Sequence, residues 1–371
     1  MYNLIVKETE QEVLEHFNSL GIDGVGFETT TPNVIWHKIP HDYSQDYLTF
    51  VSKANNNTLQ WKATSDENTR TISVSTDNGE TWAEKTSTTG GTVLAVLNNG
   101  DRMLIKGNNA NYGNDDEWWY NQFTSTGYYD VEGNIMSLVG GDNFTGLTTL
   151  DSGSTFLFLF SAYDEESAEY FDSYLQSAGN LVLPATILSD YCYESMFDGC
   201  NSLTTTPKLP ATTLADGCYS SMFSDCSTLT TTPELPATTL ADWCYWGMFS
   251  GCTSLTAAPI LPATTLADGC YSTMFQYCSS LIAAPELPAT MLTEQCYDNM
   301  FVGCSSLNYV KCLATDISAS ECTQSWLSEV SATGTFVKNP LMPIGSGVAG
   351  YYWPIGGSYG IPVGWTVVDA S

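Results

Sequence analysis

The chain has 371 residues, of which 43% are hydrophobic and 12% aromatic, a composition typical of a folded protein with two or three domains. Eleven lysines and arginines face 41 aspartates and glutamates, which gives a formal net charge of −30. A surface this acidic repels phosphate backbones and anionic lipid headgroups, and no apolar run approaches the roughly 20 residues that cross a bilayer, so we expect neither nucleic-acid partners nor membrane insertion.

Residues 1–42 are predicted to form a small α+β unit. Thr9 and Glu12 have the spacing of a capping box, and apolar residues at helical spacing follow until Gly21 ends the helix. A unit of this size buries too little surface to be stable on its own. We interpret it as an attachment or docking module, with an N-terminal cap of the next domain as the alternative. The first residues lack the pattern of a secretory signal, so either a signal was removed or the protein stays in the cytosol until it is released.

Residues 43–140 are predicted to form a small β-sandwich. Turn signals recur about every ten residues, and the Asn78-Gly79 and Asn99-Gly100 pairs favour tight hairpins. Between these turn signals, short strands are predicted at 47–51, 58–62, 71–75, 81–85, 93–97 and 103–106.

The segment from Ser75 to Trp82 is similar to the Asp-box hairpin of sialidase propellers. In that device the aspartate, here Asp77, caps the turn, Gly79 takes the positive φ and the tryptophan packs beneath. Sialidases carry several copies together with an arginine cluster that holds the sugar carboxylate. This chain has one copy and few arginines, so we interpret the segment as a structural hairpin.

The acidic cluster Asp115-Asp116-Glu117 directly precedes Trp118-Trp119-Tyr120. Carboxylate oxygens suit Ca²⁺, but the cluster lacks EF-hand spacing, and a solvated loop beside buried aromatic residues is the alternative. We predict no metal site, no cofactor and no catalytic residues, because the known phosphate-binding, nucleophile and zinc motifs are missing from the sequence.

Residues 141–338 contain a 26-residue repeat. Full copies begin at Leu183, Leu209, Leu235, Leu261 and Leu287, with a degenerate copy at Leu313 and a worn copy upstream around Tyr170-Phe171-Asp172. Stacked copies bury the positions that rarely change, which a single copy cannot do. We expect a short parallel strand at 229–235, interrupted by Pro233, and a helical turn at 241–249.

Eleven of the twelve cysteines follow the repeat in two series, and Cys312 stands outside both. The spacing is not that of a zinc site or of a disulfide framework. We expect a ladder of buried thiols, which fits folding in a reducing compartment. A disulfide between stacked coils is the alternative.

The pattern M-F-S-x-C-x-S/T-L-T followed by L-P resembles the BspA-type leucine-rich repeat family over residues 150–338. The resemblance implies a curved or twisted solenoid with an adhesive role, carried on bacterial surfaces or on virions of gut bacteroidal phages. The expected fold class is therefore mixed α/β: a leucine-rich-repeat solenoid with short parallel strands, the β-sandwich and α+β unit before it, and an irregular cap at 339–371 with a strand at 365–368.

Aromatic residues at variable repeat positions are the predicted ligand-binding residues: Trp243, Trp246, Tyr191 and Tyr277. Exposed aromatic rings on a rigid scaffold suit stacking on sugars or contact with a protein, although the same rings could pack onto adjacent coils or onto a sister chain.

The preferred hypothesis is a non-enzymatic virion protein. Its N-terminal unit would bind other virion proteins, its solenoid would bind a host-surface glycan or protein, and it could assemble as a homotrimer. The alternatives are a secreted bacterial adhesin of the same family and, on the Asp-box alone, a glycan-active enzyme.

Overall fold

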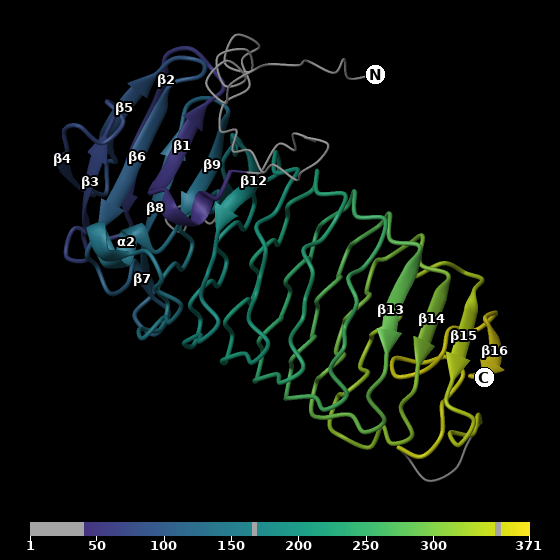
Figure 1. The fold of residues 1–371 in the computed structure, drawn as a ribbon. Coiled ribbons are helices and arrows are strands. Elements are labelled where there is room, and N and C mark those ends of the chain that lie inside the picture. Colours follow the sequence, from purple (N-terminus) through teal and green to yellow (C-terminus); the bar gives the residue numbers. More distant parts are fainter. Residues whose placement is uncertain (1–40, 165–168, 346–349) are drawn as a thin grey trace, which may run out of the picture.

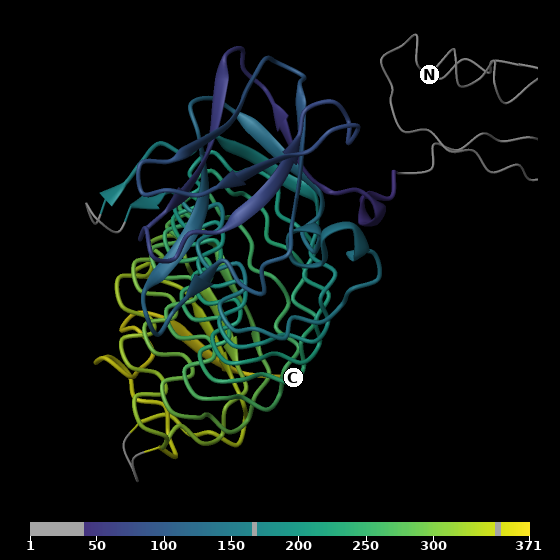
Figure 2. The ribbon, with the colours of Figure 1, turned by 90° about the vertical axis from the view of Figure 1, so that its left-hand side faces the viewer.

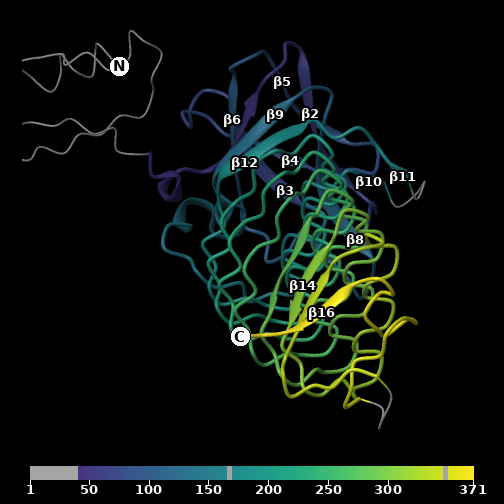
Figure 3. The same cartoon turned by 90° about the vertical axis from the view of Figure 1, so that its right-hand side faces the viewer.

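The computed structural model describes residues 41–164, 169–345 and 350–371. Figure 1 shows two packed β-sheets at one end, followed by a row of stacked coils that runs to the C-terminus. Figures 2 and 3 view the molecule from its two ends, along the direction in which the coils stack. The predicted unit at residues 1–42 lies almost wholly outside the described residues.

Two sheets form the N-terminal end. The larger has the order β12 (Leu175–Val182), β9 (Tyr129–Asn134), β1 (Leu48–Ser52), β6 (Arg102–Gly107), β3 (Thr71–Ser75) and β4 (Ala83–Thr86). The smaller has the order β5 (Thr92–Leu97), β2 (Asn57–Ala63), β8 (Trp119–Ser125) and β7 (Gly113–Asn114). Phe50 of the larger sheet and Phe123 of the smaller sheet meet with ring centroids 4.9 Å apart, so the core lies between the sheets.

The six strands predicted between residues 47 and 106 are present as β1 to β6 with small shifts at their ends. Strands β7, β8 and β9 were not predicted. The helices are short: α2 (Ser137–Gly140) and the 3-10 turns η1 (Tyr43–Gln45) and η2 (Gly141–Asn143). No helix within the described ranges is long and apolar enough to cross a membrane.

Strand β12 joins the sheets to the coils. It pairs in parallel with β9, and residues of the following coil continue the contact, since the Ala178 amide donates to the Thr205 carbonyl. A two-stranded hairpin, β10 (Tyr163–Asp164) and β11 (Glu169–Tyr170), leaves the body just before β12. The core is therefore continuous from the sheets into the repeats.

Each coil contains a ribbon of turns where a helical turn was predicted. The Met196 amide donates to the Tyr193 carbonyl of its own coil, whereas the Phe197 amide donates to Met222 of the next coil. This alternation persists along the ribbon because every fourth residue is left-handed, for example Tyr191 (φ 55°) and Ser195 (φ 49°). An α-helix needs consecutive right-handed residues and amides bonded within the segment, so the helical prediction at 241–249 is wrong.

The strand prediction at 229–235 is also wrong. Proline recurs at the equivalent position of four coils. Because it has no backbone N–H, it cannot donate a hydrogen bond to a strand of the neighbouring coil. These prolines are Pro207, Pro233, Pro259 and Pro285. Where Lys311 takes the place of proline, a parallel sheet forms from β13 (Ala283–Leu287), β14 (Tyr309–Cys312), β15 (Thr335–Lys338) and β16 (Thr366–Asp369). Strand β16 lies one residue from the strand predicted at 365–368.

The expected mixed α/β class is therefore wrong. The described residues form an almost entirely β and turn structure in several sheets, with very few helical residues. Left-handed residues at every fourth position prevent helices in the coils, and stacked prolines prevent most of the repeat strands.

The coils are held together by ladders of identical buried side chains. Phe197 and Phe223 stack with centroids 5.4 Å apart, and Tyr193 and Tyr219 stack at 5.7 Å. The upstream copy was misplaced, since Phe160, not a residue at 170–172, stacks on Phe197. At the other end Trp326 stacks on Tyr297 and Trp353 stacks on Trp326, which closes the ladder.

All twelve cysteines are buried free thiols, so no disulfide joins the coils. In one series each thiol lies within hydrogen-bonding reach of a phenylalanine carbonyl of the preceding coil, at 3.0–3.2 Å: Cys226 to Phe197, Cys252 to Phe223, Cys278 to Phe249 and Cys304 to Phe275. The thiols thus act as small core residues that also donate a weak hydrogen bond.

Candidate functional site

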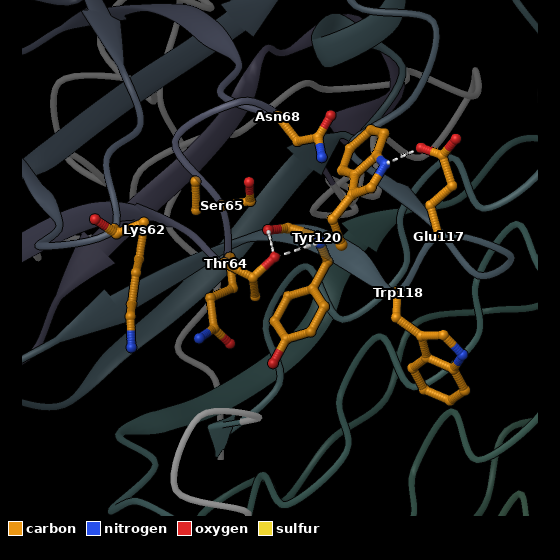
Figure 4. Close-up of a pocket in the computed structure, with 11 residues that line it drawn as sticks. Lys62, Thr64, Ser65, Asn68, Glu117, Trp118 and Tyr120 are labelled. Carbon is orange, nitrogen blue, oxygen red and sulfur yellow. Dashed lines mark hydrogen bonds between the residues drawn. The ribbon is translucent and has the colours of Figure 1, made fainter.

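A polar hollow of about 700 Å³ lies where β2 ends and β8 begins. It is lined by residues 62–65, Asn68, Thr89, residues 117–120 and Gln122, and we call it the Trp118 hollow. The register of the sheet explains the grouping, because Lys62 of β2 lies opposite Gln122 of β8. Figure 4 shows Lys62, Tyr120 and Trp118 extending to the same side.

Trp118 stands at the rim with 62% of its surface exposed. Its backbone is left-handed (φ 52°), which is a true outlier for a bulky residue. In the coils, left-handed residues recur at every fourth position of the turn ribbon. In the described part of the sheets, the other left-handed residues that are not glycine are Asn56 and Asn78, and asparagine favours this conformation. Strain of this kind at an exposed aromatic residue makes Trp118 a candidate functional residue.

The neighbouring side chains fix the rim. Trp119 is buried and donates from Nε1 to Glu117 Oε2 at 3.0 Å. The Arg70 guanidinium lies 4.4 Å from the centre of the Trp119 ring, and it also donates to the Asn111 carbonyl at 2.9 Å. The Trp118 amide donates to the Asp115 carbonyl, which sets the turn that projects the ring outward.

The lining of the hollow contains several uncharged hydrogen-bonding groups. Thr64 Oγ1 accepts from the Tyr120 amide at 3.0 Å, and Thr89 Oγ1 donates to Asp66 at 3.0 Å. Gln122 is 1% exposed, and its Oε1 atom has no hydrogen-bond partner among the described residues. A buried amide oxygen without a partner costs about 1–3 kcal/mol, so a donor from a ligand would relieve that cost.

The loop that carries Trp118 rests on the first coils. The Asp115 amide donates to Ser154 Oγ at 3.1 Å. Burial, and then the nearby Asp115 charge, raise the pKa of Glu194 to about 8, while burial followed by Asp116 raises the pKa of Asp115. Tyr191 also has a raised pKa, from burial first and then Asp115. The charge of Asp115 therefore acts on Glu194 where the Trp118 loop meets the coils.

The chain matches no protein-family model, no curated protein and no solved structure.

The four predicted ligand-binding residues are not brought together. Tyr191, Trp243 and Tyr277 each lie over a glycine of the next coil, as a Cβ atom on Gly217, Gly269 or Gly303 would meet the ring at 2.3–2.4 Å. Trp243 and Trp246 belong to one turn and are 37% and 41% exposed. Tyr277 is 52% exposed and lies at a different position of the repeat. Of the four, Tyr191 lies near the Trp118 loop.

The Asp-box segment is a hydrogen-bonded hairpin. Asp77 Oδ1 accepts from the Thr81 amide at 2.9 Å and from the Ser75 hydroxyl at 2.7 Å. Hydrogen bonds from Thr81 lower the pKa of Asp77 to about 2. Within the described ranges, no group of three or more acidic, histidine or cysteine side chains could hold a metal ion, the Asp115–Glu117 loop included.

The sequence reasoning named residues 115–120 but not the hollow. Lys62 belongs to the predicted strand β2, Asn68 and Thr89 come from other loops, and Gln122 belongs to a strand that was not predicted. A signal for β8 did exist, because Trp119, Tyr120 and Phe123 are residues that favour strands.

Proposed function

We propose that the chain is a non-enzymatic adhesion protein of a virion that binds a molecule on the host surface. One observation carries the proposal: Trp118 presents an exposed indole on a strained left-handed backbone at the rim of a polar hollow. Aromatic rings with an apolar face and a polar tip supply much of the energy of recognition surfaces. The strain in the backbone lowers stability, and a binding role accounts for its presence.

Two further features support an adhesive role on a virion. The resemblance of the repeats to the BspA-type family implies adhesion. The twelve buried thiols fit a protein that folds in a reducing cytoplasm, where virion components are made. Display of many copies would make weak single contacts effective.

The adhesion test uses Trp118→Gly, with Trp243→Gly as a matched control. Both tryptophans are exposed and left-handed, so glycine removes the ring and relieves the backbone in each case. We expect fluorescently labelled wild-type protein to bind bacteroidal host cells. Trp118→Gly should reduce that binding at least tenfold, and Trp243→Gly should leave it within twofold.

Loss of cell binding in Trp243→Gly alone would show that the binding surface lies on the coils. For the virion, we expect mass spectrometry of purified phage particles to find the protein in stoichiometric amount. Recovery from the host envelope alone would replace the virion with a bacterial adhesin.

A further inference from the structure

We infer that the ligand of the Trp118 hollow is an uncharged saccharide. This inference rests on the proposed adhesion function and adds the chemical class of the ligand. It combines three observations: the exposed ring of Trp118, the hydroxyl and amide groups in the lining, and the partners within the chain that already hold both arginines.

The ring and the lining suit a sugar. An exposed indole offers a flat apolar face, which matches the C–H face of a pyranose ring. Thr64, Ser65, Asn68 and Thr89 place hydroxyl and amide groups around the hollow. Such groups both donate and accept, as sugar hydroxyls do.

Gln122 supplies the most specific contact. Its buried Oε1 atom accepts no hydrogen bond from the described residues. The terminal amide torsion is soft, so this oxygen can turn toward a donor in the hollow. A sugar hydroxyl or an acetamido N–H provides that donor, whereas a carboxylate provides none.

The charges argue against an acidic sugar. Proteins hold a sugar carboxylate with the paired N–H groups of arginine. The chain has two arginines: Arg70 is held by Asn111 and by the face of Trp119, and Arg102 pairs with Glu132. Lys62 brings one positive charge to the lining, and Glu117 brings one negative charge. With Glu117 at the rim and a net charge of −30, the site repels anions.

The test titrates the full chain with neutral oligosaccharides and with the same oligosaccharides capped by sialic acid. Tryptophan fluorescence and calorimetry report binding. We expect neutral probes to bind and the sialylated forms to bind at least tenfold more weakly. Trp118→Gly should abolish the neutral binding, Gln122→Met should weaken it about tenfold, and Trp243→Gly should leave it unchanged.

The outcomes separate this inference from the adhesion proposal. Binding of sialylated probes alone would overturn the uncharged class and leave adhesion standing. A chain that binds host cells but none of the saccharides would overturn the saccharide class alone. A chain that binds neither would overturn both. Because glycine suits a left-handed backbone, we expect Trp118→Gly to melt no lower than wild type, and that result would show that the lost binding does not come from unfolding.

Discussion

Glu194 is the carboxyl group through which pH should act on the contact between the Trp118 loop and the coils. Its pKa rises from an ordinary 4.5 to about 8, chiefly through burial and then through Asp115. Between these values the folded protein holds a proton that the unfolded chain has released. The stabilising contribution of this group is therefore full below about pH 4.5 and is lost as the pH rises through about 8.

The prediction compares Glu194→Gln with wild type in urea unfolding at pH 5 and pH 9. Glutamine mimics the protonated acid, so the variant should match wild type at pH 5 and exceed its free energy of unfolding at pH 9. One pKa unit corresponds to about 1.4 kcal/mol, so the expected difference at pH 9 is on the order of 3–5 kcal/mol. Glu234→Gln, at an exposed position of the coils, is the control for a change of one charge. If the two variants change the free energy of unfolding equally at both pH values, Glu194 is not the group that makes stability fall with rising pH.

The cysteines give a second prediction at the scale of single residues. All twelve thiols are buried, and burial raises the pKa of every one of them. Only the thiolate reacts with a disulfide reagent. We expect the native protein to be inert to such a reagent at pH 8 and all twelve thiols to react in guanidinium chloride. Prompt labelling of a protein with unchanged circular dichroism would show that a thiol is exposed.

At the scale of elements, the sequence predicted the strands better than the coils. Turn signals about every ten residues revealed β1 to β6. Only some of these strands also alternate clearly: β2 buries every second residue, whereas β4 buries none. The sequence did not distinguish the turn ribbon from a helix, because both structures bury the same apolar residues of the repeat. Gly247 within the stretch predicted as helical, and Gly217 at the position equivalent to Trp243 in the preceding copy, were the available signals for left-handed positions.

The site was harder to predict than the strands. The sequence placed aromatic residues beside an acidic loop, and Trp119 and Tyr120 are indeed buried. It could not show that Trp118 faces solvent, or that turns far apart in the chain meet around it, because those facts depend on the pairing of β2 with β8.

Packing between neighbouring ribbons can be tested at Gly269. This residue has φ +60°, and a Cβ atom there would lie 2.3 Å from Trp243. We expect Gly269→Ala to lower the free energy of unfolding by about 2–4 kcal/mol, through the ring contact and the backbone together. In the Trp243→Gly background only the backbone cost of about 1 kcal/mol should remain.

A double-mutant cycle in urea measures the coupling between the two positions. Equal costs of Gly269→Ala in both backgrounds would mean that the Trp243 ring does not rest on the next coil. That result would also restore Trp243 as a ring free to contact a ligand.

At the scale of the whole molecule, the coils behave as a stack in which each coil contacts its neighbours. The Phe249 ring stacks on Phe223 at 5.8 Å and on Phe275 at 5.7 Å, and the Phe249 amide donates to Met274. Stability in such a stack is approximately a sum over coils and their interfaces. The sheets meet the stack at its first coils, through β9 and β12.

Deletion of residues 235–260 should therefore yield a folded, shorter protein. Removing one full repeat lets Phe223 stack on Phe275 and keeps every ladder in register, because the deleted length equals the 26-residue spacing. A deletion of residues 235–254 shifts the ladders against each other and should prevent cooperative folding, as circular dichroism and urea unfolding would show. The full-repeat deletion also removes Trp243 and Trp246 but leaves the Trp118 hollow intact. Unchanged saccharide binding in this protein would assign recognition to the sheets, and loss of binding with a native unfolding curve would assign it to the coils.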